Sequence, residues 1–152
     1  AEIIPSLAHF VSVKRRMEII GTARGITVYD DFAHHPTAIQ TTLEGLRAKV
    51  DKARILVAME PRSNSMRLGA HSLQIAPSLN TADAVVFLQR PELPWDAEAV
   101  LSALKGEGRK VATVDALIET LRTIVRDGDH IVFMSNGGFE DAPRRCLAAL
   151  QQ

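Results

Sequence analysis

Residues 29–36 form a short polar run of acids and imidazoles between two apolar stretches. Asp31 supplies a carboxylate and His34 and His35 supply imidazoles, and α/β folds bind their ligands at such a position, at the carboxyl end of a strand. Pro36 has the fixed φ that suits the first position of a helix, and the free N–H groups there favour an anion. The run therefore predicts an anionic ligand at the start of a helix.

Two other interpretations of this run are open. Asp31 is also of a type that caps helices, and His34 and His35 would then be exposed polar residues. A metal site is less favoured, because adjacent histidines lack the i, i+4 spacing of helical ligands and no second ligand cluster is evident. We therefore predict no metal ligands in this chain.

Two further polar segments follow apolar runs. The segment 60–67 contains Arg62 and Arg67, whose guanidinium groups suit bidentate binding of a carboxylate or phosphate, although most arginines are solvated surface charges. The segment 135–138 ends in a glycine pair, which is typical of a turn and would also let a ligand approach backbone N–H groups closely.

Each of the three polar segments comes directly after a predicted strand, at 26–29, 55–59 or 131–134. Neighbouring parallel strands end at the same edge of a sheet, where α/β folds bind their ligands. We therefore expect the three segments to meet at one rim. Apolar residues at helical spacing also predict a helix from Pro36 to about Lys49, directly after the first polar segment in the sequence.

The remaining pattern also alternates between strands and helices. Met17 to Val28 predicts a hairpin around a connection at 21–25. Further elements are predicted as strands at 84–88 and 111–114, and as helices near 68–79, at 97–104, at 115–125 with Asp115 as its cap, and at 143–150. The predicted fold class is α/β: a Rossmann-like, mostly parallel sheet of about six strands with helices on both faces and an antiparallel element from the first hairpin.

Composition excludes several classes of function. The chain has 152 residues, 46% of them hydrophobic, which fits one globular domain. Its 18 basic residues balance 18 acidic ones, so no overall field favours nucleic acid or an anionic membrane. The apolar stretches are strand-sized, and we expect neither a membrane span nor a signal peptide. Cys146 is a single cysteine, which favours a reducing, cytoplasmic setting.

Four motifs together resemble the C-terminal domain of the Mur ligase family, the ATP-dependent peptidoglycan precursor ligases of bacteria. They are Val13-Lys14-Arg15-Arg16-Met17-Glu18, Asp31-Phe32-Ala33-His34-His35-Pro36, Glu60-Pro61-Arg62-Ser63-Asn64-Ser65-Met66-Arg67 and Met134-Ser135-Asn136-Gly137-Gly138-Phe139. The resemblance covers nearly the whole chain. Within the family, the last two motifs are most similar to members that join UDP-N-acetylmuramate to L-alanyl-γ-D-glutamyl-meso-diaminopimelate in murein recycling.

The resemblance implies a nucleotide half of the site. In such ligases ATP phosphorylates a substrate carboxylate, and an amine then attacks the acyl phosphate to form an amide. By resemblance, Asp31 would bind the ribose hydroxyls of ATP and Arg16 would contact the nucleotide near its ribose or phosphates. His34 and His35 would lie beside the nucleotide and the reacting phosphate, as the catalytic residues of this domain.

The resemblance also implies a peptide half of the site, whose members would face the carboxylates of the murein tripeptide or line the same pocket. These residues are Arg62, Asn64, Arg67, Ser135, Asn136 and Gly137. Guanidinium groups suit a tripeptide that carries several carboxylates.

No Gly-x-x-x-x-Gly-Lys-[Ser/Thr] phosphate loop occurs in the chain, although phosphoryl transfer needs a phosphate cradle and magnesium ligands. The family keeps these in a central domain, and its UDP-sugar site in an N-terminal domain. We therefore expect residues 1–12 to be an interdomain linker or short helix and residues 13–152 to be the C-terminal domain. Its partners would be those two domains, and its cofactors would be ATP and Mg²⁺, with the magnesium ligands mainly in the central domain. The chain alone would not turn over.

Other functions remain open. A UDP-N-acetylmuramate:L-alanine ligase shares the double histidine, and a folylpolyglutamate synthetase shares the acid–histidine signature. A non-catalytic nucleotide- or protein-binding α/β module is the alternative if 152 residues are the natural length. A nicotinamide-dependent oxidoreductase is disfavoured, because no Gly-x-Gly-x-x-Gly follows a strand.

Overall fold

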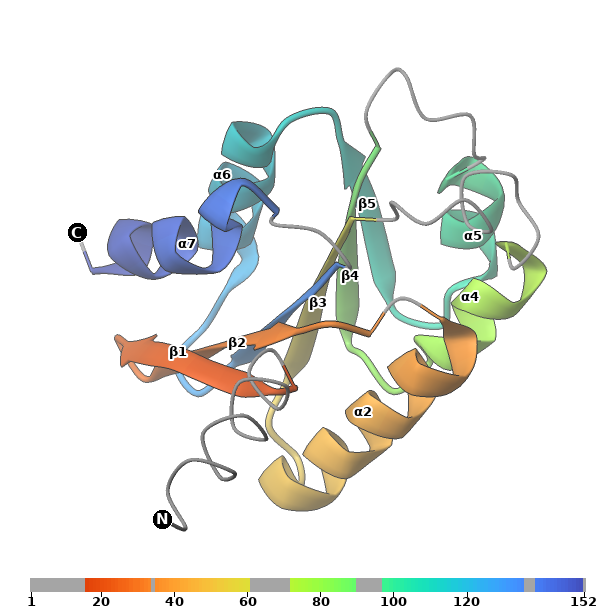
Figure 1. Ribbon diagram of the computed structural model, residues 1–152, viewed down its shortest axis with the longest axis horizontal. Helices are drawn as coiled ribbons and strands as arrows, with labels where there is room; N and C mark the ends of the chain where they lie inside the picture. Colours follow the sequence, from red (N-terminus) through yellow and green to blue (C-terminus); the bar gives the residue numbers. More distant parts are fainter. Residues whose placement is uncertain (1–15, 34, 61–71, 90–96, 136–138, 152) are drawn as a thin grey trace, which may run out of the picture.

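The structure is a computed structural model in which six strands form one sheet, in the order β1-β2-β6-β3-β4-β5 (Figure 1). The predicted fold class is confirmed: the first hairpin is antiparallel and the other neighbouring strands pair in parallel. The structure describes residues 16–33, 35–60, 72–89, 97–135 and 139–151.

The antiparallel hairpin consists of β1 (Glu18–Ala23) and β2 (Ile26–Asp31). Its turn is shorter than the predicted connection, because Arg24 and Gly25 alone make the reversal, with φ of 54° and 77°. Glycine suits such a left-handed conformation. The register of the pair shifts between Ile19 and Gly21. The edge strand β1 therefore carries a bulge.

The parallel strands are β3 (Ile55–Glu60), β4 (Ala84–Leu88), β5 (Glu107–Val111) and β6 (His130–Ser135). Every residue of β3 and β4 is buried, as continuous apolar runs in a sheet covered on both faces require. Because β6 lies between β2 and β3, the last strand of the chain is at the centre of the sheet.

The strand predicted at 111–114 lies closer to the N-terminus in the structure, at Glu107–Val111. Strand β5 begins at Glu107, and its residues are exposed or half-buried because it forms the second edge of the sheet. Val114, although apolar, already belongs to the next helix. The Oγ1 atom of Thr113 accepts the helix-capping hydrogen bond from the N–H of Ala116 at 3.1 Å, so Thr113 and not Asp115 is the cap.

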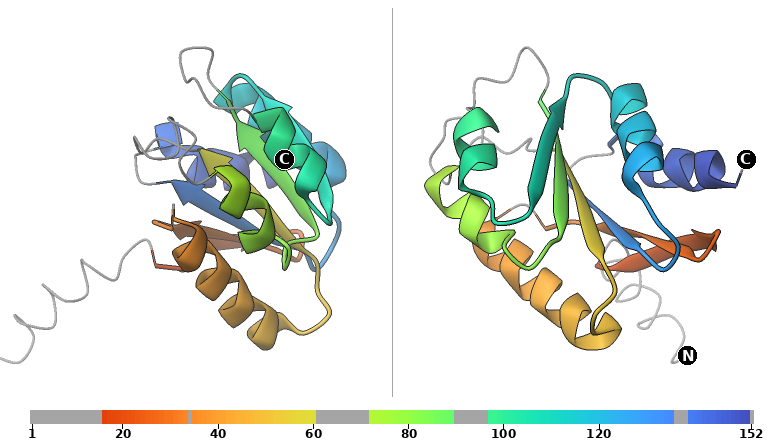
Figure 2. Two further views of the ribbon diagram at one scale, coloured as in Figure 1. Left: turned by 90° about the vertical axis from the view of Figure 1, so that its right-hand side faces the viewer. Right: turned by 180° about the vertical axis from the view of Figure 1, so that it is seen from behind.

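Helices cover the two faces of the sheet separately (Figures 1 and 2). One face carries α2 (Pro36–Val50), α4 (Ser72–Ser78) and α5 (Ala97–Ala103). The other carries α6 (Val114–Ile124) and α7 (Ala142–Leu150), the latter preceded by the 3₁₀ turn η1 (Phe139–Asp141). Two separate clusters of buried apolar side chains fill the spaces between these layers and the sheet.

Helix α2 begins where the sequence predicts it, with Pro36 in its first turn and His35 as its N-cap. Its inner face consists of Ile39, Leu43 and Leu46, all fully or almost fully buried against the sheet. This packing fixes the start of the helix at the end of β2, where the polar run lies.

Candidate functional site

The ends of β2, β6 and β3 lie side by side at one edge of the sheet. Asp31 pairs with Met134 of β6, and Glu60 of β3 pairs with Ser135 of the same strand. In Figure 1 the blue strand β6 runs between β2 and β3. The three strand ends therefore meet at one rim, as the prediction requires, while 61–67 and 136–138, which follow two of them, lie outside the described residues.

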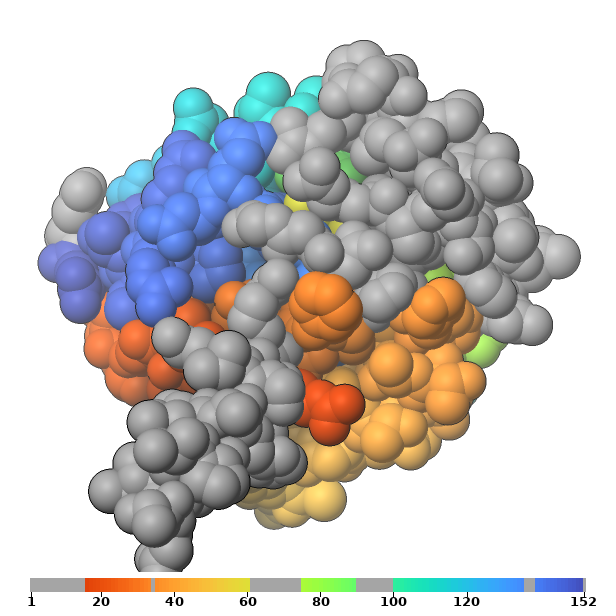
Figure 3. Space-filling view, in the orientation of Figure 1, coloured from red at the N-terminus to blue at the C-terminus, as the bar shows by residue number. Residues whose placement is uncertain are grey.

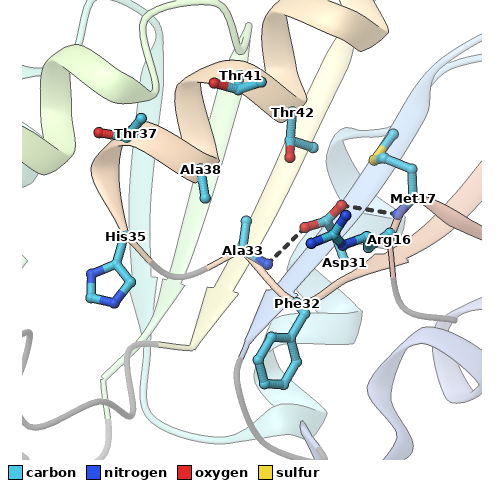
Figure 4. A pocket seen from close by; sticks show the side chains of 10 residues that line it. All are labelled: Arg16, Met17, Asp31, Phe32, Ala33, His35, Thr37, Ala38, Thr41 and Thr42. Carbon is cyan, nitrogen blue, oxygen red and sulfur yellow. Dashed lines mark hydrogen bonds between the residues drawn. The ribbon is translucent and has the colours of Figure 1, made fainter. Parts of the chain in front are cut away.

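The side chain of Asp31 is buried at this rim and receives two backbone hydrogen bonds. Its Oδ1 accepts from the N–H of Ala33 at 2.7 Å, and its Oδ2 accepts from the N–H of Met17 at 2.9 Å (Figure 4). Burial raises the pKa of Asp31, while the two backbone bonds and the charge of Arg16 oppose that rise. A carboxylate offers about four lone-pair sites, so these bonds leave acceptor capacity for a ligand hydroxyl.

The alternative in which Asp31 caps the helix is wrong. Its bond to Ala33 closes a local turn before the helix, and the N-cap of α2 is His35, which makes no side-chain capping bond. Met17 has a φ of 52°, a conformation uncommon for a residue with a side chain. The bond from Asp31 thus holds the chain in place as it enters β1.

A cavity of about 600 Å³ opens beside Asp31, a size typical of small-molecule sites. Arg16 lies next to the Asp31 carboxylate on one side, and the outer residues of α2 form the other (Figure 4). In Figure 3 the corresponding red and orange surfaces lie close together on the face toward the viewer. The lining residues are Arg16, Met17, Asp31, Phe32, Ala33, His35, Thr37, Ala38, Thr41 and Thr42.

The start of α2 supplies positive potential to the cavity. The first intrahelical bond runs from the N–H of Ile39 to the carbonyl of His35 at 2.9 Å, so the N–H groups of Thr37 and Ala38 precede it without helical partners. No acidic residue lies in the first turn to neutralise the helix dipole. Together with the Arg16 guanidinium, these groups suit an anion, while Asp31 suits a hydroxyl donor.

A second polar pair lies at the neighbouring strand ends. The hydroxyl of Ser135 donates to Oε1 of Glu60 at 3.0 Å, and both side chains are fully buried. Sequence reasoning placed Glu60 at the start of a loop and did not select it. The signal that could have identified it is that this acid directly continues an all-apolar buried strand.

The structure describes four of the ten predicted site residues. It brings Arg16, Asp31 and His35 together around the cavity, and it places the Ser135 hydroxyl in the buried pair with Glu60. Their predicted ligand roles remain predictions. The other six lie outside the described residues: His34, Arg62, Asn64, Arg67, Asn136 and Gly137.

Other candidate chemistry is sparse in the described part of the chain. It contains no group of three or more side chains that could hold a metal ion. The Cys146 thiol is buried, and burial raises its pKa to about 12, so it stays protonated and unreactive at neutral pH. Among the helices described, none has the length and apolar character needed to cross a membrane.

Comparison with known proteins identifies a family. Residues 15–137 match the family described as Mur ligase, glutamate ligase domain. The chain is 44% identical to the UDP-N-acetylmuramate–L-alanyl-γ-D-glutamyl-meso-2,6-diaminoheptandioate ligase of Escherichia coli, over 99% of the chain and 33% of that protein. It is 43% identical to the Haemophilus influenzae ligase of the same name, over 96% of the chain and 32% of that protein. The UDP-N-acetylmuramate–L-alanine ligase of Streptomyces coelicolor is 34% identical, over 100% of the chain and 35% of that protein.

Solved structures of similar proteins share the fold of this chain. A murein peptide ligase from Psychrobacter arcticus superposes with a TM-score of 0.82 at 41% identity, covering 91% of this chain and 30% of the other. A single solved domain from Haemophilus ducreyi superposes with a TM-score of 0.77 at 41% identity, covering 89% of this chain and 99% of the other. The chain thus spans about a third of the length of the curated relatives it matches.

Proposed function

This chain belongs to the Mur ligase family, and we therefore propose that it is the domain of an ATP-dependent ligase that joins UDP-N-acetylmuramate to L-alanyl-γ-D-glutamyl-meso-diaminopimelate. The observation that carries this proposal is the cavity beside Asp31 and Arg16 at the start of α2, in a chain 43–44% identical to two ligases named for those substrates. The reaction would return a murein tripeptide to the nucleotide-linked precursor.

The chemistry divides into two steps. The γ-phosphoryl group of ATP moves to the carboxylate of UDP-N-acetylmuramate, giving an acyl phosphate and ADP. The α-amine of the tripeptide then attacks the acyl carbon, the C–O bond to phosphate breaks, and the nitrogen loses a proton as the amide forms. This domain would contribute positioning and charge stabilisation to both steps.

The cavity would hold the nucleoside end of ATP. Asp31 has acceptor capacity for a ribose hydroxyl, while the guanidinium of Arg16 and the first turn of α2 favour the phosphates. His35 lines the cavity, and His34 precedes it in the sequence. We propose that these imidazoles contact the nucleotide or the reacting phosphate.

The peptide would bind beyond the ends of β3 and β6. Six residues are proposed to line that site: Arg62, Asn64, Arg67, Ser135, Asn136 and Gly137. The carboxylates of the tripeptide call for guanidinium partners, which Arg62 and Arg67 would supply.

The rest of the active site would come from other domains. This chain has no phosphate-loop motif and spans about a third of its curated relatives. We propose that a central domain holds the ATP phosphates and Mg²⁺, that an N-terminal domain holds the UDP-sugar, and that this chain alone does not turn over. A cytoplasmic location in bacteria belongs to the same proposal.

A UDP-N-acetylmuramate:L-alanine ligase is the second candidate. It is favoured by the 34% identity to the Streptomyces coelicolor enzyme over the whole chain. The likeness to a bifunctional folylpolyglutamate synthase/dihydrofolate synthase from Yersinia pestis, at 14% identity, concerns the fold alone.

The deciding experiment measures ADP release by a full-length protein in which this chain is joined to the upstream domains. UDP-N-acetylmuramate and Mg·ATP are supplied with either the tripeptide or L-alanine. We expect tripeptide-dependent release. Release with L-alanine alone would transfer the assignment to the second candidate, and release with neither would favour a non-catalytic binding module.

A further inference from the structure

Glu60 is an ionisable side chain in a fully buried position. It follows five buried residues of β3, and its side chain has no exposed surface. Burying a carboxylate is costly unless hydrogen bonds replace its water, and an apolar pair of similar volume is often at least as stable. A buried acid at this position therefore points to a role other than stability.

Glu60 has a hydrogen-bond partner on the neighbouring strand. Glu60 and Ser135 are the last register pair of β3 and β6, and the Ser135 Oγ donates to Oε1 at 3.0 Å. The bond is thus a side-chain link at the final pair of the parallel ladder. It fixes the two strand ends relative to each other in the central part of the sheet.

The link is placed where both proposed peptide-binding segments begin. Arg62 follows Glu60 by two positions, and Asn136 follows Ser135 directly. A shift of one strand end relative to the other would move the two segments apart. A positional error of about 1 Å at reacting groups is enough to reduce activity strongly.

We propose that Glu60 is a positioning residue for the amine substrate, acting through its hydrogen bond from Ser135 to hold the ends of β3 and β6 in register. This inference rests on the proposed function for the identity of the substrate, and on the described Glu60–Ser135 pair for the mechanism. Ser135 then contributes to the peptide site through Glu60, since its hydroxyl is fully buried.

The test uses the full-length enzyme and four variants of the pair. Ser135→Ala removes the donor, Glu60→Ala removes the acceptor, and their combination removes both. Glu60→Gln removes the charge but keeps an acceptor oxygen. The matched control is Ser78→Ala, another buried serine, whose hydroxyl donates to the Ile75 carbonyl at 2.6 Å on α4.

Steady-state kinetics give the first outcome. We expect Ser135→Ala and Glu60→Ala each to raise the KM for the amine substrate about tenfold, with the KM for ATP changed less than roughly twofold. The double variant should be no worse than either single variant, and Glu60→Gln should stay within about threefold of the parent enzyme. Additive single effects, an equal rise in the KM for ATP, or a Glu60→Gln as impaired as Glu60→Ala would each overturn the proposal.

Hydrogen exchange gives a second outcome that does not depend on which substrate is used. In Ser135→Ala, peptides covering the ends of β3 and β6 should exchange faster, while β1, β4, β5 and the Ser78→Ala control should not. Unchanged exchange at both strand ends would also overturn the proposal. If the parent enzyme uses L-alanine, the proposed function fails, and the kinetic series is run with L-alanine to judge the positioning role separately.

Discussion

The Oδ2 atom of Asp31 lies 2.9 Å from the backbone nitrogen of Met17, and this bond joins the end of β2 to the chain that enters β1. The same carboxylate accepts from Ala33 at 2.7 Å. One buried side chain therefore shapes the cavity from two sides, by holding the backbone next to Arg16 and by closing the turn that leads to α2.

Asp31→Asn tests that double role. An amide has one acceptor oxygen, so one of the two backbone N–H groups would face the NH₂ group and lose its bond. We expect the free energy of unfolding to fall by about 1–3 kcal/mol, and the KM for ATP of the full-length enzyme to rise.

Chemical denaturation of the chain and ATP kinetics of the full-length enzyme measure the two effects. Asp127→Asn, an exposed acid before β6, is the control and should change neither. If Asp31→Asn lowered stability without changing the KM for ATP, Asp31 would be removed from the proposed nucleotide site.

His130 should make stability depend on pH. Its Nδ1 lies 2.8 Å from the hydroxyl of Tyr29, and burial lowers its pKa from 6.5. Between that lowered pKa and 6.5 the unfolded chain binds more protons than the folded one, so the free energy of unfolding rises with pH through this window. Below the lowered pKa this contribution has been lost.

Denaturation curves at several pH values, compared with those of His130→Gln, isolate the contribution. The variant should show a flatter dependence on pH just below 6.5, whereas His35→Gln, at an exposed histidine, should keep the slope of the parent chain. Equal slopes for the parent and His130→Gln would contradict the assignment.

Arg62→Ala should act mainly on the peptide. A lost charge-assisted hydrogen bond to a carboxylate is worth about 1.5–3 kcal/mol, which corresponds to a rise of at least about tenfold in the KM for the tripeptide. The KM for ATP should change little. Initial rates with each substrate varied in turn provide the measurement, and a rise confined to ATP would require the proposed roles of the segments after β2 and β3 to be exchanged.

Phe139→Ala should weaken the apolar core between the sheet and α7. The Phe139 ring is almost fully buried and packs edge-on against Phe133, with ring centroids 5.6 Å apart. We expect a loss of about 3–5 kcal/mol in the free energy of unfolding. Phe32→Ala is the control, because that ring is 46% exposed and should cost much less; equal losses would show that the ring pair does not anchor this region.

The pattern of apolar residues was enough to predict strands β3, β4 and β6, because they are buried on both faces of the sheet. It also predicted helix α2, which buries one of its faces. It failed at β5, an edge strand whose Arg109 and Lys110 are exposed and give no apolar signal. At the site, spacing identified Asp31 and His35, since strand ends and helix starts are visible in sequence.

The Glu60–Ser135 bond could not be predicted in the same way. It joins residues 75 positions apart and depends on β6 lying next to β3, which no local pattern encodes. The two backbone bonds of Asp31 were missed for a related reason, because side-chain geometry decides whether an acid serves a ligand, a helix or a turn.

The central place of β6 also determines when the site can exist during synthesis. Strands β2 and β3 are separated in the sheet by a segment that the ribosome makes about a hundred residues after β2, so they have no native neighbour on that side until residues 130–135 have emerged. The rim that carries Asp31 and Glu60 is therefore completed late in translation. A chain that stopped before β6 would lack the middle of its sheet and would expose two unpaired strand edges to aggregation.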